Sequence, residues 1–79
     1  MNREILLGKK ALAERELRDL ENIADSALTM IIMKADAYKD FDALDTELIS
    51  TNAQTLHDTV VKLRECKKVI AKLKSELGE

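Results

Sequence analysis

The stretch that decides the fold runs from Leu20 to Tyr38 and reads LENIADSALTMIIMKADAY. Wound at 3.6 residues per turn, its apolar side chains cover an arc of about 200° around the helix axis. A helix packed on a single neighbour needs an apolar stripe only somewhat wider than about 100°, so we expect this one to contact two or three other helices. The apolar positions are Leu20, Ile23, Ala24, Ala27, Leu28, Met30, Ile31, Ile32, Ala35 and Tyr38.

Helical character extends from this stretch back to the N-terminal residues. Asn2 is a suitable cap, and Glu4 lies where a negative charge favours a helix start. A ladder of apolar residues at alternating three- and four-residue steps, with two steps skipped, predicts one helix over residues 3–39. A new helix starting at Asp25–Ser26 would instead give a three-helix bundle, and the sequence leaves this alternative open. The ladder consists of Leu6, Ala13, Leu17, Leu20, Ala24, Ala27, Ile31 and Tyr38.

Residues 40–51 form the expected connection, because its three aspartates favour turns and helix caps over a regular helix. Its apolar residues have near-helical spacing, which predicts a short helical piece within the turn. The second long helix is predicted over residues 52–77, since Thr51 and Gln54 have the spacing of a capping box. Gly78 stands where a glycine commonly ends a helix.

Heptad spacing in the second helix is regular over three repeats. It places Leu56, Leu63, Ile70 and Leu77 at the a positions, and Thr59, Cys66 and Leu73 at the d positions. Packed antiparallel, a first helix longer than the second leaves about ten N-terminal residues overhanging. Residues 5–7 would then have no internal partner.

The length and composition of the chain favour association. A domain of 79 residues has a marginal core, and small domains usually add disulfides, a metal ion or oligomerisation. The single cysteine cannot form an internal disulfide. The predicted fold of residues 1–79 is therefore a single all-α domain. It is a long antiparallel helical hairpin with a short helical turn, self-associating most simply into a dimeric four-helix bundle. The sequence does not decide between a dimer and a higher oligomer.

The wide apolar arc also supplies candidates for the subunit interface. Large exposed apolar patches usually mark association, and methionine suits adaptable contact surfaces. Side chains toward the edges of the arc lie beyond the reach of one partner helix, so we predict that they contact a second copy. The predicted interface residues are Ile23, Leu28, Met30, Ile32 and Met33.

Residues that could support catalysis or metal binding do not converge. His57 is the only histidine, and its register beside Leu56 places it on the outside. The register of Cys66 instead buries it, where a thiol acts as a small apolar side chain. Asp40, Asp42 and Asp45 resemble the start of a calcium-binding loop, but the glycine and glutamate that such a loop requires are missing. We therefore predict no enzymatic activity, no cofactor and no metal.

A basic stripe on the second helix offers a different function. Arg64, Lys68 and Lys72 recur every four residues and form a line that a phosphate backbone could contact. The antiparallel hairpin would set this basic segment near Glu14, Glu16, Asp19 and Glu21, so we expect the charges largely to neutralise each other. Nucleic acid is for this reason the less favoured partner.

No segment approaches the run of about 20 apolar residues needed for a membrane span, and an unpaired cysteine agrees with a reducing compartment. The sequence therefore predicts a cytoplasmic protein with no membrane partner. Its predicted role is that of a small structural, adaptor or regulatory protein that acts through self-association and contact with a protein partner. The alternative is a small dimeric nucleic-acid-binding regulator that uses the basic stripe.

Overall fold

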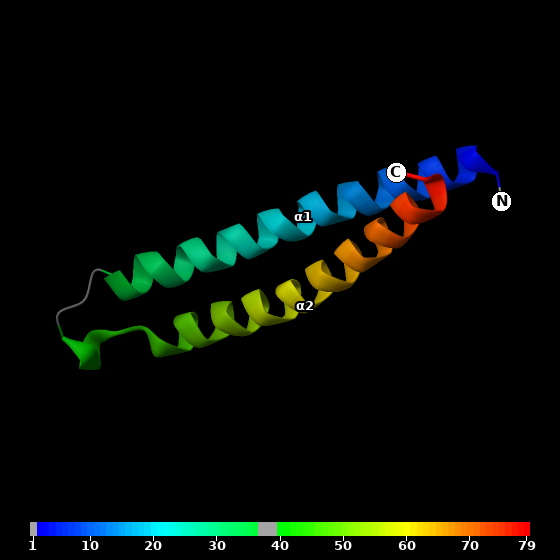
Figure 1. Cartoon of the computed structure of the whole chain (residues 1–79). Helices are drawn as coiled ribbons and strands as arrows, with labels where there is room; N and C mark the ends of the chain where they lie inside the picture. Colours follow the sequence, from blue (N-terminus) through cyan, green and yellow to red (C-terminus); the bar gives the residue numbers. More distant parts are fainter. Residues whose placement is uncertain (1, 37–39) are drawn as a thin grey trace.

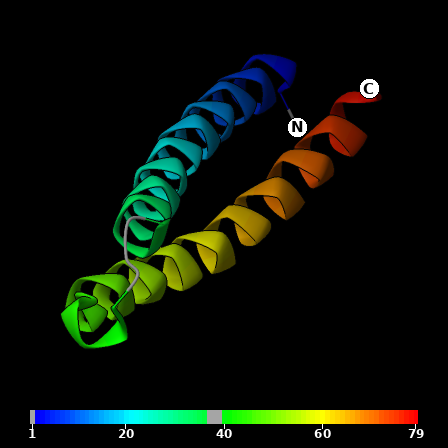
Figure 2. The same ribbon diagram turned by 90° about the vertical axis from the view of Figure 1, so that its left-hand side faces the viewer.

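The computed structural model describes residues 2–36 and 40–79, which form an antiparallel pair of long helices (Figure 1). Helix α1 spans Arg3–Asp36, a short 3-10 helix, η1, spans Phe41–Ala43, and helix α2 spans Thr46–Leu77. Figures 1 and 2 show the two long helices side by side, with both termini at the end away from the turn. The described residues contain no strand, so the predicted all-α hairpin is confirmed.

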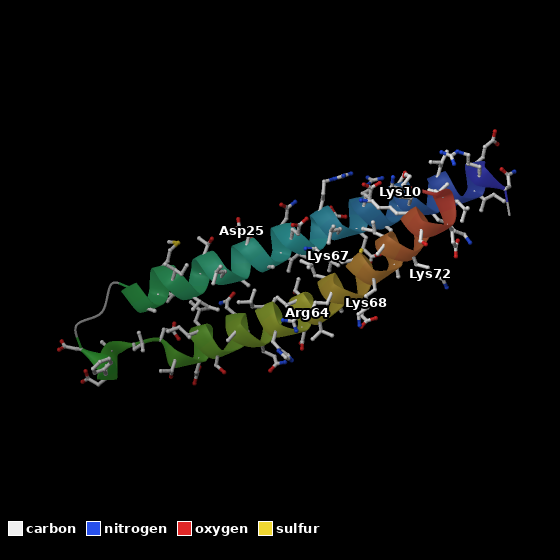
Figure 3. All side chains as sticks on the ribbon, viewed as in Figure 1. Lys10, Asp25, Arg64, Lys67, Lys68 and Lys72 are labelled. Atoms are coloured by element: carbon white, nitrogen blue, oxygen red, sulfur yellow. The ribbon has the colours of Figure 1, made fainter. Side chains whose placement is uncertain are left out.

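Helix α1 is continuous over 34 residues, and the three-helix alternative does not occur. The Asn2 side chain accepts a hydrogen bond from the backbone N–H of Glu4 over 2.9 Å, as expected of a cap. Asp25 is exposed on the side of α1 away from α2 (Figure 3), where its carboxylate stays solvated without ending the helix. Residues 37–39, including the predicted ladder residue Tyr38, lie outside the described part of the chain.

Helix α2 begins at Thr46, earlier than the predicted start at residue 52. The prediction was wrong because it took Thr51 as the cap. Asp45 caps the helix instead, its side chain accepting the backbone N–H of Leu48 over 3.0 Å. Thr51 lies inside the helix and is exposed. Asp45, one of the three aspartates expected to favour a turn or a helix cap, therefore adds about one and a half turns to α2.

The C-terminal end of α2 follows the prediction. Gly78 has a φ of 78°, in the left-handed region, and its backbone N–H bonds the carbonyl oxygens of Lys74 and Ser75. These bonds use carbonyl groups that the end of a helix otherwise leaves without partners. Glycine adopts this conformation without the steric cost that other residues incur.

The predicted N-terminal overhang is absent, because the early start of α2 makes it 32 residues long against 34 for α1. Leu6 is buried, whereas Ile5 and Leu7 are exposed. The Arg3 guanidinium donates to the carbonyl oxygen of Leu77 over 3.2 Å. The Lys10 ammonium binds both carboxylate oxygens of Glu79, at 2.6 and 2.7 Å. This hydrogen bond holds the pKa of the Glu79 carboxyl below its usual range.

The seam between the helices follows the predicted heptads most closely near the chain ends. Four a and d residues of α2 join three residues of α1 in one buried cluster, with Leu17 and Leu63 packed against it. The prediction that Cys66 is buried is confirmed. The cluster contains Leu6, Ala13, Leu20, Cys66, Ile70, Leu73 and Leu77.

Candidate interaction surface

The apolar core occupies only one half of the hairpin. We call residues 2–20 and 63–79 the end half, and residues 21–36 and 40–62 the turn half. All seven members of the buried cluster lie in the end half. Among residues 21–35 and 40–62 only two are buried, Ala27 and Thr59, and both are small. The most apolar segment of α1 therefore lies where the hairpin covers side chains least.

Several seam positions in the turn half are small or polar, which contributes to the weak burial. Ala24 and Ala27 of α1 offer little apolar area. Asn52 occupies a d position of α2, and its side-chain amide donates to the carbonyl oxygen of Leu48 in its own helix, over 2.8 Å. Leu56 and Ile31, also on the seam, are only half-buried. Two helices alone thus leave this part of the chain incompletely packed.

The five predicted interface residues are not buried within the chain. Met30 is half-buried, and the other four are exposed. At 100° per residue, Ile23 and Met30 lie within about 20° of each other on one side of the seam, with Met33 about 60° further out. Leu28 and Ile32 lie on the other side of the seam. The set is therefore divided between the two faces of the hairpin, and one partner on one face covers only part of it.

One face carries two shallow hollows between the helices, and we call it the groove face. In the turn half, Ile23 and Met30 border a hollow together with Asn52 and Thr55 of α2. Where the two halves meet, Glu16 borders a second hollow with Lys62 and Val69. Ile5 and Leu12, both exposed, project within about 20° of the line through Ile23 and Met30. The a and d ladder did not single out Ile5, Leu12 or Val69, because they lie outside the seam.

The opposite face is formed differently. Lys67 and Lys74 of α2 border a hollow there with Leu17 and Ile70. Their long methylene stems are well suited to lie on this apolar surface while the ammonium groups stay in water. On α1, Leu28 and Ile32 are on this face in the turn half, and Leu7 is about 30 Å away toward the chain ends. The apolar side chains of this face are thus fewer and more separated.

The basic stripe is exposed, with Arg64, Lys68 and Lys72 lying along α2 (Figure 3). The only ion pair that involves it within the described residues joins Lys68 and Glu65 of the same helix, at 3.5 Å. The expected contacts with the acids of α1 do not form. Exposed ion pairs gain little free energy, and the hairpin does not bring these side chains together. The acids in question are Glu14, Glu16, Asp19 and Glu21.

The two residues whose side chains could serve in catalysis or metal binding, His57 and Cys66, lie in different surroundings. His57 is exposed on α2, as predicted. Cys66 is buried, and burial raises the pKa of its thiol, with a further rise from the nearby Glu16 carboxylate. A raised pKa lowers the thiolate fraction that a nucleophile or metal ligand requires. Within residues 2–36 and 40–79, no three His, Cys, Asp or Glu side chains are grouped as a metal ion would need.

The hairpin exposes more surface than a compact protein of its mass. Its radius of gyration is 17.7 Å, against about 12 Å for a compact domain of this length. Its accessible area is 6056 Å², about 1,200 Å² above the area expected for a compact monomer of 8.9 kDa. This elongated shape, with dimensions of 59 × 16 × 14 Å, leaves both faces open to a partner.

In comparisons with protein-family models, curated proteins and solved structures, no match to this chain was found. Among the helices that the structure describes, none has the length and apolarity needed to cross a membrane. A function therefore has to be inferred from the side chains that the hairpin leaves uncovered.

Proposed function

We propose that this chain is a small structural, adaptor or regulatory protein that acts through protein–protein contacts. Its first contact is with a second copy of itself, which gives a dimeric four-helix bundle. The proposed compartment is the cytoplasm, where a buried free thiol such as that of Cys66 stays reduced. No catalytic role is proposed.

The observation that carries this proposal is the poor burial of the most apolar part of α1. From residue 21 to residue 35 the chain contains six large apolar side chains, and none of them is buried. Exposed apolar area of this extent favours association, because covering it removes it from water. These side chains are Ile23, Leu28, Met30, Ile31, Ile32 and Met33.

The excess surface also has the size that a dimer requires. A stable interface of standard size buries about 800 Å² on each partner, and the hairpin exposes about 1,200 Å² beyond a compact monomer. A four-helix bundle would use part of this excess. The fold itself does not choose between self-association and a different protein partner, so the test has to measure both mass and stability.

The test is light scattering during size-exclusion chromatography at tens of micromolar. We expect the mass of two chains. We also expect the thermal midpoint to rise with protein concentration, since dimerisation stabilises the folded state by mass action. A mass of one chain with a concentration-independent melt would overturn the proposal and leave a stable monomeric hairpin.

A second candidate function has one observation in its favour. Arg64, Lys68 and Lys72 are exposed on one line, and α1 does not neutralise them by contact. A small dimeric nucleic-acid-binding regulator would use this stripe on phosphates. Phe41, 88% exposed, lies in η1 at the turn and supplies no platform on which bases stack beside the stripe. We therefore rank this function second.

A further inference from the structure

We propose that two copies of the hairpin pair through their groove faces with their turns at the same end. Helix α1 of each copy then lies along α2 of the other. This inference rests on the self-association proposed above, and it adds which face is buried and how the two copies are oriented. Its partner is a second copy of this chain.

The choice of face follows from where exposed apolar side chains gather. Nine large apolar residues of α1 and α2 are exposed. Five lie on the groove face, three on the opposite face, and Val61 borders a groove-face hollow from the outer side of α2. Half-buried Met30 adds a sixth apolar side chain to the groove face. The five are Ile5, Leu12, Ile23, Met33 and Val69, and the three are Leu7, Leu28 and Ile32.

Two arrangements bring the same face of each copy together with two-fold symmetry. In one, the two-fold axis runs along the bundle, the turns lie at the same end, and α1 packs on the partner's α2. In the other, the axis is perpendicular to the bundle, the turns lie at opposite ends, and α1 packs on the partner's α1. The distribution of side chains along the groove face distinguishes them.

Apolar matching favours turns at the same end. On the groove face of α1, Ile23, Met30 and Met33 lie in the turn half, whereas Ile5 and Leu12 lie in the end half together with the charged Lys9 and Glu16. With the turns together, Ile23 and Met30 lie along the turn half of the partner's α2, where the residues that border the groove-face hollow, Asn52 and Thr55, are uncharged. With the turns at opposite ends, each apolar turn half would cover charged positions of the partner and force them out of water, which is costly.

Charge matching points the same way. Glu16 and Lys62 border the same hollow and so lie at one level along the hairpin. Neither of the two ion pairs found within 4.0 Å among the described residues joins Glu16 to Lys62. A two-fold axis along the bundle preserves levels, so each Glu16 would face Lys62 of the other copy. In a fully overlapping dimer with the turns at opposite ends, residues in the middle of a helix meet their equivalents in the partner. The Lys62 side chains of the two copies would then face each other, and so would the two Asp19 side chains. Like charges in such contacts are strongly unfavourable.

The face is tested by two matched substitutions on α1. Ile23 is 48% exposed and Leu28 is 45% exposed, so an aspartate at either position should leave the hairpin folded, which circular dichroism checks. We expect Ile23→Asp to raise the dissociation constant of the dimer at least about 10-fold, because each dimer would bury two unpaired carboxylates. Leu28→Asp should change it less than about 2-fold. The reverse pattern would place the interface on the opposite face.

The orientation is tested by electron–electron distance measurement between spin labels. In a Cys66→Ala chain, a label at Phe41→Cys marks the turn and a label at Ser75→Cys marks the end half. With helix layers about 10 Å apart, same-end pairing predicts a short distance, within about 30 Å, for each labelled protein alone. Mixing the two labelled proteins should add only a distance that approaches the 59 Å length of the hairpin.

Each other outcome has a distinct meaning. Long distances for each labelled protein alone, with a short one on mixing, would place the turns at opposite ends and overturn this inference while the dimer stands. A mass of one chain without any intermolecular distance would overturn the proposed function itself. The mass of the labelled Cys66→Ala protein is therefore measured on the same samples.

Discussion

The thiol of Cys66 donates a hydrogen bond to the backbone carbonyl oxygen of Ala13 across the seam, over 3.2 Å. The small side chain of Ala13 leaves room for this close approach between α2 and the backbone of α1. A thiol is a weak donor, so the contact adds little free energy by itself. Its value is geometric, because it places a d position of α2 directly against α1 and so fixes the register of the end half.

Thiol reactivity should report this register. We predict that Cys66 reacts with a thiol reagent far more slowly in the native protein than in denaturant, since it is buried and its raised pKa lowers the thiolate fraction. A matched control is His57→Cys in a Cys66→Ala chain, which places a thiol on the exposed side of the same helix and should react rapidly. Equal native rates at the two positions would contradict the observed packing of α2.

The stability of the protein should also depend on this thiol at alkaline pH. Burial and then Glu16 raise the pKa of Cys66 above its ordinary value of 9.0, so the folded state holds this proton more tightly than the unfolded state. The associated stabilisation is complete below pH 9.0 and is lost as the pH rises through the raised pKa. We expect wild type to lose stability relative to Cys66→Ala as the pH rises above 9.0 and through the raised pKa.

The comparison uses urea midpoints of both proteins at one protein concentration, so that lysine titration and mass action affect both proteins alike. A constant difference in midpoint from neutral to alkaline pH would show that Cys66 titrates equally in the folded and unfolded states.

The start of α2 can be tested by substituting the two candidate caps separately. Asp45→Ala removes the acceptor for the backbone N–H of Leu48, and loss of such a cap costs about 1 kcal/mol of folding free energy. Thr51 is exposed inside the helix, so Thr51→Ala should be neutral or slightly stabilising, because alanine has the higher helix propensity. Chemical denaturation of the two variants gives both values. A larger loss for Thr51→Ala would support a helix that begins near residue 52.

Heptad spacing predicted the seam well because burial in a two-helix hairpin follows the a and d positions. It placed Cys66, Ile70, Leu73 and Leu77 in the interior, where the structure has them. The start of α2 was missed for a local reason. Aspartate favours a turn and a helix cap alike, and the contact between Asp45 and Leu48 that distinguishes these roles exists only in three dimensions. The error also removed residues 5–7 from the predicted core, although Leu6 is buried.

The candidate surface could be predicted only in part. The width of the apolar arc indicated that residues between 20 and 38 exceed the needs of one partner helix, and the exposure of Ile23 and Met33 agrees with this. The arc also placed Met30 and Ile32 near its two edges, and in the structure they lie on different faces of the hairpin. Which face a partner covers depends on the side chains of α2 beside each edge, and the periodicity of α1 alone does not show these.

Nucleic-acid binding is expected to be weak, and the geometry of the basic stripe gives the reason. Arg64 and Lys72 are eight residues apart, so the three cations span only about 12 Å of helix. Contacts to three phosphates give a salt dependence of roughly −2.7 in log K against log salt, which leaves little affinity at physiological ionic strength. Glu65 lies 3.5 Å from Lys68, and the whole chain has a net charge of −2, so neither local nor overall charge strengthens the attraction.

We therefore predict no micromolar binding of duplex or single-stranded nucleic acid at about 150 mM salt, measured by fluorescence anisotropy. Weak retention on heparin at low salt is expected from the exposed stripe, and Arg64→Glu with Lys68→Glu should abolish it without changing the mass of the dimer, because both residues lie outside the groove face. Micromolar binding by wild type that the double variant loses would make the nucleic-acid regulator the better account of this protein. Binding that the double variant retains would instead point to a different basic surface, and the same double variant with Lys72→Glu distinguishes the two cases.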